Sequence, residues 1–153
     1  MPLFHDLFLA LSTNALMRNV VMNFPLSRRV ARRFVAGETL DEAIAVVAKL
    51  NRQKMNVTFD VLGESVTTES EARAAKDEYL RALDAIAAHR VSSHVSVKLT
   101  QMGLDLSPDL CLDHLRQIVA QARTIGSFAR IDMEDSHHTK ATLNVQNPAR
   151  RVR

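Results

Sequence analysis

The central segment of the chain reads Val95-Ser96-Val97-Lys98-Leu99-Thr100-Gln101, the pattern of a short buried β-strand that ends in a lysine and a polar turn. Its apolar residues recur at every second position, the spacing at which side chains share one face of a strand, while Lys98 lies on the opposite face with Ser96. Lysine is rarely buried unless it is paired or functional. We therefore expect Lys98 to face the mouth of a parallel sheet or barrel and to bind an anionic group there.

Two similar strands and two helices are predicted around this segment. Residues 55–62 and residues 128–134 also alternate between apolar and polar side chains, which predicts a strand before the central one and a strand after it. A capping box, Thr-x-x-Glu, opens a predicted helix over residues 68–89. A serine N-cap followed by proline opens a second one over residues 107–126.

This strand–helix–strand–helix–strand order is typical of an α/β fold with a parallel sheet and right-handed crossovers. Three such strands are too few to close a barrel, which needs eight. We expect either a small doubly wound domain or the front part of a larger (βα)8 barrel. The predicted domains are a helical segment over residues 1–54, a partial barrel over residues 55–143 and a divergent basic tail over residues 144–153. Within the first segment, apolar stripes predict three helices before residue 36, and a capping box at Thr39 opens a fourth.

Composition limits the function classes. The chain has 153 residues, of which 46% are hydrophobic and 24% charged, as in globular proteins. Its net charge of +3 comes partly from terminal arginines and predicts no nucleic-acid partner, because binding needs a basic face. A single cysteine fits a reducing, cytosolic compartment. The uncharged apolar runs are far shorter than the ~20 residues of a membrane-spanning helix.

Ionisable side chains lie near the ends of all three predicted strands. Asp60 lies near the end of the first strand and Glu64 just after it, Lys98 lies at the end of the second strand, and Asp132 and Glu134 lie in the third. Parallel strands bring such ends together, which favours a binding site. The residues alone leave several readings open. Lys98 either binds an anion, forms a Schiff base or extends into water, and the carboxylates either steer a ligand or form a structural ion pair.

Other reactive side chains indicate no further site. The neighbouring His137 and His138 diverge and have no third ligand at a suitable spacing, so we expect a surface loop and no metal. Cys111 has no base near it in the sequence and is expected in the core or at its boundary. The common dinucleotide and P-loop signatures, GxGxxG and GxxxxGK[ST], are absent from the sequence.

Four segments resemble the monofunctional bacterial proline dehydrogenases, in the order and spacing of that family. They are Arg33–Leu40, Asp60–Thr67, Ser96–Asp105 and Arg130–Glu134. The resemblance covers roughly residues 1–143 but only about the first half of such an enzyme. It implies N-terminal helices followed by the first three βα units of a distorted (βα)8 barrel that binds FAD.

The resemblance also implies an activity and roles for individual residues. The reaction is oxidation of L-proline to Δ1-pyrroline-5-carboxylate, with FAD as hydride acceptor and a quinone as electron acceptor, in the cytoplasm or at the inner membrane surface. Lys98 matches the ammonium that meets the substrate carboxylate, and Asp132 matches an active-site aspartate. Met133 matches a position against the flavin, and Glu64 matches the carboxylate of a mobile gate over the substrate. The oligomeric state is not implied.

The sequence departs from the family after Leu143, and the arginine expected opposite Glu64 has no counterpart. We therefore expect a truncated member of the family. The alternative reading is a non-catalytic fragment or a partner-binding remnant, which the open sheet and the basic end would suit. A Schiff-base enzyme of aldolase type, built on Lys98, is a third reading.

Overall fold

The computed structural model of the chain describes residues 35–37, 39–63 and 66–149, which fall into two units that divide after Ala43. The first unit contains the start of helix α4 (Leu40–Arg52), where the Oγ1 atom of Thr39 accepts a hydrogen bond of 3.3 Å from the Glu42 amide. This is the helix start predicted at Thr39. The helices predicted before residue 35 lie outside the described residues. Among those residues, none of the helices has the length and hydrophobicity needed to cross a lipid bilayer.

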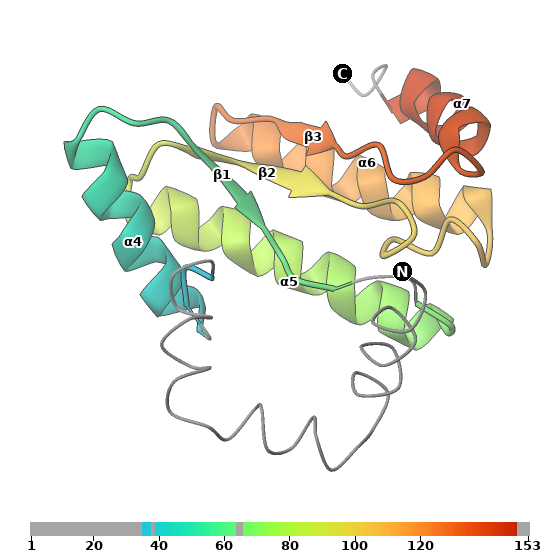
Figure 1. The fold of residues 1–153 in the computed structure, drawn as a ribbon, viewed down its shortest axis with the longest axis horizontal. Coiled ribbons are helices and arrows are strands. Elements are labelled where there is room, and N and C mark those ends of the chain that lie inside the picture. Colours follow the sequence, from blue (N-terminus) through green and yellow to red (C-terminus); the bar gives the residue numbers. More distant parts are fainter. Residues whose placement is uncertain (1–34, 38, 64–65, 150–153) are drawn as a thin grey trace, which may run out of the picture. The chain divides into compact units, whose positions relative to one another are not determined.

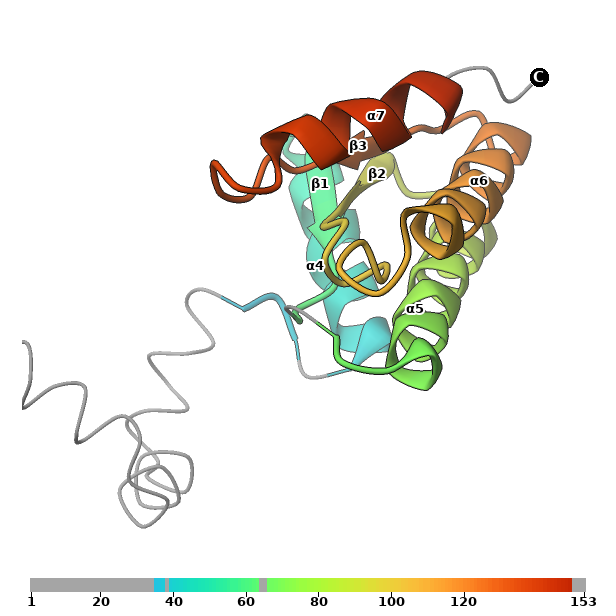
Figure 2. The ribbon, with the colours of Figure 1, turned by 90° about the vertical axis from the view of Figure 1, so that its right-hand side faces the viewer.

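The second unit contains a parallel sheet and its connecting helices (Figure 1). Its elements, in chain order, are the remainder of α4 from Ile44 onward, β1 (Val57–Asp60), α5 (Glu69–Ala88), β2 (Ser93–Val97), α6 (Pro108–Thr124), β3 (Ala129–Ile131) and α7 (Thr139–Ala149). The strands lie side by side in the order β1-β2-β3, with β2 in the centre. Helices α5 and α6 lie together against one face of the sheet, as Figure 2 shows. The predicted α/β order and the parallel sheet are thus confirmed.

Local sequence signals start both crossover helices. In α5, the Thr68 side chain accepts a hydrogen bond of 3.2 Å from the Glu71 amide, and the Glu71 carboxylate accepts one of 3.1 Å from the Thr68 amide. In α6, the Ser107 side chain caps the first turn and Pro108 occupies its first position, where no amide hydrogen is needed. The capping box and the serine N-cap predicted from the sequence are both confirmed.

The core lies between the sheet and helices α5 and α6. Its largest fully buried apolar side chains come from the two helices, from β2 and from the loop after β2: Tyr79, Leu83, Leu115, Ile118, Val95, Val97, Leu99 and Met102. Burial of each such side chain contributes roughly 1.5–3 kcal/mol. Because Leu99 and Met102 belong to this core, they anchor the loop that begins with Lys98.

That loop, residues 98–107, is compact. The amide of Leu104 donates to the Leu99 carbonyl at 3.0 Å, and the amide of Gly103 donates to the Thr100 carbonyl at 3.2 Å. Gly103 has a φ of +91°, a backbone conformation that glycine adopts without strain. The loop therefore holds Lys98 and Thr100 in fixed positions at the carboxyl end of β2.

The structure differs from the predicted elements in two ways. The strands are shorter, and β2 ends at Val97, so Lys98 directly follows the strand instead of lying within it. Helix α7 was not predicted, because residues 135–153 show only a thin apolar pattern. Its inner face uses the small side chains of Thr142 and Val145, which are buried where α7 packs against α6.

Candidate active site

The face of the sheet opposite α5 and α6 carries polar side chains from all three strands. Those of β1 and β2 interact directly, since Thr58 Oγ1 and His94 Nε2 lie 2.7 Å apart. The parallel register sets Asp60 beside Ser96 and Ser96 beside Arg130. Polar and charged groups therefore accumulate toward the carboxyl end of the sheet, which is where parallel α/β folds bind their ligands.

A cavity of about 450 Å³ opens at the carboxyl ends of β2 and β3. Its lining is almost entirely polar: Lys98, Thr100, Asp132, Met133, Glu134, Asp135 and His138. Three of the four predicted site residues, Lys98, Asp132 and Met133, therefore line one cavity. The fourth, Glu64, lies outside the described residues.

Hydroxyl groups hold two of the three carboxylates that the segment after β3 contributes to this cavity, those of Asp132 and Glu134. The Ser96 hydroxyl donates to Asp132 Oδ1, and the Asp132 amide donates to the Val97 carbonyl at 3.0 Å. The Thr100 hydroxyl donates to Glu134 Oε1 at 2.5 Å, and the Thr100 amide donates to Glu134 Oε2 at 3.1 Å. Ser96 and Thr100 are only 4% and 3% exposed, so water competes little for these bonds.

The side chain of Lys98 makes neither a hydrogen bond nor an ion pair shorter than 4 Å within the part of the chain that the structure describes. The structural ion pair between Lys98 and Asp132, considered from the sequence, is therefore not formed there. The charge of Lys98 still acts at longer range, because it partly offsets the rise that burial causes in the pKa of Asp60. An ammonium group beside a cavity and without a short anionic contact can bind an anion.

A buried tyrosine joins the end of β1 to the loop after β2. The hydroxyl oxygen of Tyr79 lies 3.3 Å from Asp60 Oδ1 and 3.2 Å from Gln101 Oε1, so its single proton serves two acceptors. Burial raises the pKa of the Asp60 carboxyl above its usual value, although Lys98 and the Tyr79 hydrogen bond partly offset this. Burial, together with the charge of Asp60, also raises the pKa of Tyr79, which therefore stays a donor. The sequence predicted Tyr79 only as a core residue.

His138 forms part of the wall of the cavity and bridges two loops. Its Nε2 atom lies 2.9 Å from Asp105 Oδ1 and its Nδ1 atom 2.8 Å from Asp135 Oδ1. These bonds, first to Asp105 and then to Asp135, raise the pKa of His138. Slight burial acts to raise the pKa of Asp135, but the hydrogen bonds from His138 lower it overall. This bridge was missed because Asp105 and His138 are 33 positions apart.

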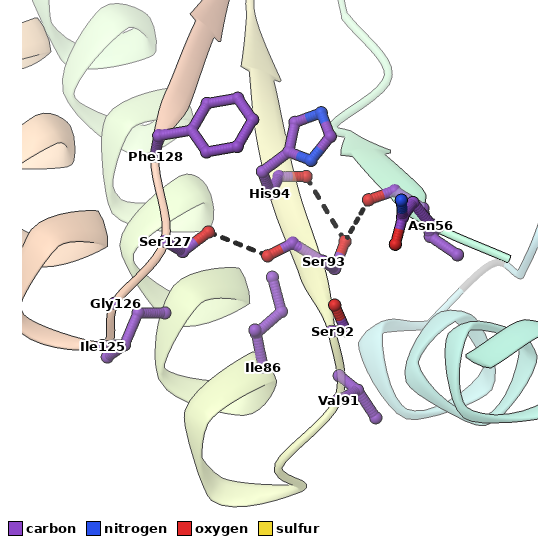
Figure 3. A pocket seen from close by; sticks show the side chains of 11 residues that line it. Asn56, Ile86, Val91, Ser92, Ser93, His94, Ile125, Gly126, Ser127 and Phe128 are labelled. Atoms are coloured by element: carbon purple, nitrogen blue, oxygen red, sulfur yellow. Dashed lines mark hydrogen bonds between the residues drawn. The ribbon is translucent and has the colours of Figure 1, made fainter. Parts of the chain in front are cut away.

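A second cavity, of about 410 Å³, lies at the amino end of the strands (Figure 3). Its serines bond to main-chain groups, since Ser93 Oγ donates to the Val57 carbonyl at 3.0 Å and Ser127 Oγ donates to the Ser93 carbonyl at 2.8 Å. The rings of His94 and Phe128 stack with centroids 4.3 Å apart. No lysine, arginine or carboxylate lines this cavity among the described residues. The charged cavity at the carboxyl end is therefore the better candidate.

Comparisons with known proteins agree on one family. The family described as proline dehydrogenase matches residues 43–151. Proline dehydrogenase 1 of Bacillus subtilis strain 168 is 42% identical over 138 residues, which are 90% of this chain and 45% of that protein. Proline dehydrogenase of Deinococcus radiodurans is 33% identical over 117 residues, which are 74% of this chain and 38% of that protein. The chain thus spans about half the length, or less, of these curated relatives.

A solved structure has the same arrangement of elements. It is proline utilization A (PutA) from Bdellovibrio bacteriovorus, inactivated by N-propargylglycine, with a TM-score of 0.71 and 27% sequence identity. The match covers 80% of this chain and 15% of that protein. The fold agreement therefore extends over most of the chain.

Proposed function

The chain belongs to the proline dehydrogenase family, and from this premise we propose that it acts in the oxidation of L-proline to Δ1-pyrroline-5-carboxylate, with FAD as hydride acceptor. One observation carries the proposal: the ammonium of Lys98, free of short contacts among the described residues, lines the same cavity as the carboxylate of Asp132. Proline is a zwitterion at neutral pH and needs one contact of each sign. The cavity offers both.

Lys98 and Asp132 have complementary roles in this proposal. The ammonium of Lys98 donates to the proline carboxylate, a charge-assisted contact that contributes about 1.5–3 kcal/mol. The carboxylate of Asp132 faces the proline nitrogen and carries charge of opposite sign. Two contacts at opposite sides of the ring would fix its orientation toward the hydride acceptor. Loss of a hydride from C5 also requires that the ring nitrogen give up one proton, because its lone pair forms the C=N bond, and this proton would pass to Asp132 or to water.

The described residues fit a flavin at one point. Met133 lines the cavity and is 56% exposed, an unusual position for a large apolar side chain next to charged groups. A methionine thioether packs well against a flat aromatic ring, and we propose Met133 as a contact of the FAD ring system. FAD supplies the hydride-accepting chemistry, which side chains lack. Glu64 is proposed as the gate carboxylate over the substrate, as the family resemblance implies.

Electron transfer onward from the flavin is proposed to reach a quinone at a membrane surface, with the protein itself in the cytoplasm. The support for the quinone is the family resemblance. Support for a reducing compartment is the single cysteine, Cys111, which is buried and unpaired.

A second candidate function is partner binding without catalysis. The observation in its favour is that β1 and β3 each pair only with β2 among the described residues, so each has an edge that another chain could pair with. The chain would then bind a partner without turning over a substrate.

Flavin content and proline turnover distinguish the two functions. The purified chain is titrated with FAD, and bound flavin is detected by its visible absorbance and quenched fluorescence. L-Proline is then added with an artificial electron-accepting dye, and D-proline serves as the control. Dye reduction that depends on both FAD and L-proline supports the enzyme. A chain that binds proline but never reduces the dye supports the binding function, and one that binds neither FAD nor proline contradicts both.

A further inference from the structure

We propose that Thr100 and Ser96 are positioning residues that keep Lys98 available for the ligand carboxylate. Thr100 donates hydrogen bonds to Glu134 and Ser96 donates one to Asp132, so neither acid needs the lysine as a partner. The inference rests on the proposed function only for the identity of the ligand, L-proline. The arrangement of hydroxyls and carboxylates around Lys98 stands independently of that identity.

The alternation of residues along two neighbouring segments creates this arrangement. Ser96, Lys98 and Thr100 follow one another at every second position, and the acids Asp132 and Glu134 do the same on the neighbouring segment. Each acid is bonded to a hydroxyl residue that flanks Lys98, and neither forms an ion pair with Lys98. The lysine is therefore bracketed by two hydroxyl–carboxylate pairs.

Thr100 holds its acid more completely than Ser96 does. Its hydroxyl and its amide donate to different oxygens of the Glu134 carboxylate, so both oxygens have a partner. Hydrogen bonds to a charged acceptor are stronger than those between neutral groups, and Thr100 is only 3% exposed. Glu134 is therefore fixed by a threonine although a lysine lines the same cavity.

The consequence is a cavity with separated charges. If Glu134 or Asp132 were free to turn, it would pair with Lys98 and neutralise the group that attracts the ligand. With Asp132 and Glu134 held by hydroxyls and Asp135 held by His138, the cavity presents three oriented anions and, among the described residues, one unpaired cation. This favours a zwitterion with a single carboxylate, and it disfavours a dicarboxylate, which these acids would repel.

The first test measures the reactivity of Lys98 itself. Reductive methylation with formaldehyde and cyanoborohydride, quantified by mass spectrometry, reports how freely each lysine amine can react. Thr100→Val removes the hydroxyl at nearly constant volume and frees Glu134 Oε1, so methylation of Lys98 is expected to slow several-fold. Thr100→Ser keeps the hydroxyl and is expected to react as the original chain does.

Two further variants make this test specific. Thr142→Val is a matched control, because Thr142 is also buried but its hydroxyl has no hydrogen-bond partner among the described residues. It should leave Lys98 unchanged. Adding Glu134→Gln to Thr100→Val removes the competing charge and should restore methylation. An unchanged rate in a folded Thr100→Val chain overturns the proposal. If that variant does not fold, Ser96→Ala, which frees Asp132, is judged by the same criterion.

The second test measures binding of L-proline by calorimetry. Loss of a hydrogen bond to a charged group corresponds to a dissociation constant raised about tenfold in Thr100→Val, with Thr100→Ser and Thr142→Val close to the original chain. Equal affinities in all four proteins overturn the role in ligand binding. If the original chain binds no proline, the proposed function fails, and the methylation rates alone decide the positioning role.

Discussion

Replacement of Lys98 by methionine tests whether this lysine serves a ligand or the fold. Methionine keeps an unbranched side chain of similar length but removes the charge. The Lys98 side chain has neither an ion pair nor a hydrogen bond to lose within the described residues. The free energy of unfolding should therefore change by no more than about 0.5 kcal/mol, as for an ordinary surface substitution.

The expected effect on ligand binding is much larger. The ammonium would donate to a substrate carboxylate, a contact of about 1.5–3 kcal/mol, and about 1.4 kcal/mol corresponds to a factor of ten. The dissociation constant for L-proline should therefore rise about 10- to 150-fold. The pKa of Asp60, which burial raises, should rise further, because the charge of Lys98 that partly offsets the effect of burial would be gone. Binding and stability are thus expected to respond very differently to one substitution.

Urea unfolding followed by circular dichroism measures the stability, and calorimetry measures proline binding. Lys140→Met is the matched control, because Lys140 is exposed on α7 and does not line the cavity. A Lys98→Met chain that loses more than about 1 kcal/mol of stability while binding proline normally would refute the reasoning, since Lys98 would then be a structural residue.

Three further predictions concern other parts of the unit. The first concerns His138, whose pKa is raised in the folded chain. Its contribution to stability is therefore complete below pH ~6.5 and is lost as the pH rises through the pKa of the folded state. In urea unfolding, His138→Gln should remove this pH dependence, and the control His137→Gln should retain it. Thr68→Ala breaks the capping box of α5 and should lower the free energy of unfolding by about 1 kcal/mol, measured by the same method; an unchanged value would mean that the cap is not formed in solution. Burial raises the pKa of the Cys111 thiol to about 12. A thiol reagent should therefore label Cys111 only when the chain unfolds. Rapid labelling of the folded chain would contradict the position of Cys111 in the core.

The elements with strong local signals were predictable from the sequence. The capping box at Thr68 and the serine N-cap at Ser107 start helices where expected, because caps depend on contacts between residues three positions apart. Helix α7 was not predicted because its buried face contains Thr142 and Val145. Threonine is not an apolar residue, so this face does not show the apolar periodicity from which a helix is predicted. Its formation depends on packing against α6, which the local sequence does not reveal.

The candidate site was predictable in its members but not in its bonding. Period-two alternation predicted that Lys98 and Asp132 lie at the ends of neighbouring strands. It could not predict that the hydroxyls of Ser96 and Thr100 would donate hydrogen bonds to the carboxylates of Asp132 and Glu134. These bonds depend on the parallel register and on the shape of the loop after β2. The bridge made by His138 likewise joins two loops whose relative position only the folded chain defines.

The central position of β2 has a consequence for the order of folding. Its contacts with both neighbouring strands are distant in sequence, since Thr58 and His94, like Ser96 and Asp132, are 36 positions apart. Closing chain segments of this length loses chain entropy before the favourable free energy of strand pairing can offset that loss. Helices α5 and α6, in contrast, form from local contacts. We therefore expect the helices to form early and the sheet to assemble around β2 late, so the pocket at the end of that strand is among the last parts of the unit to take shape.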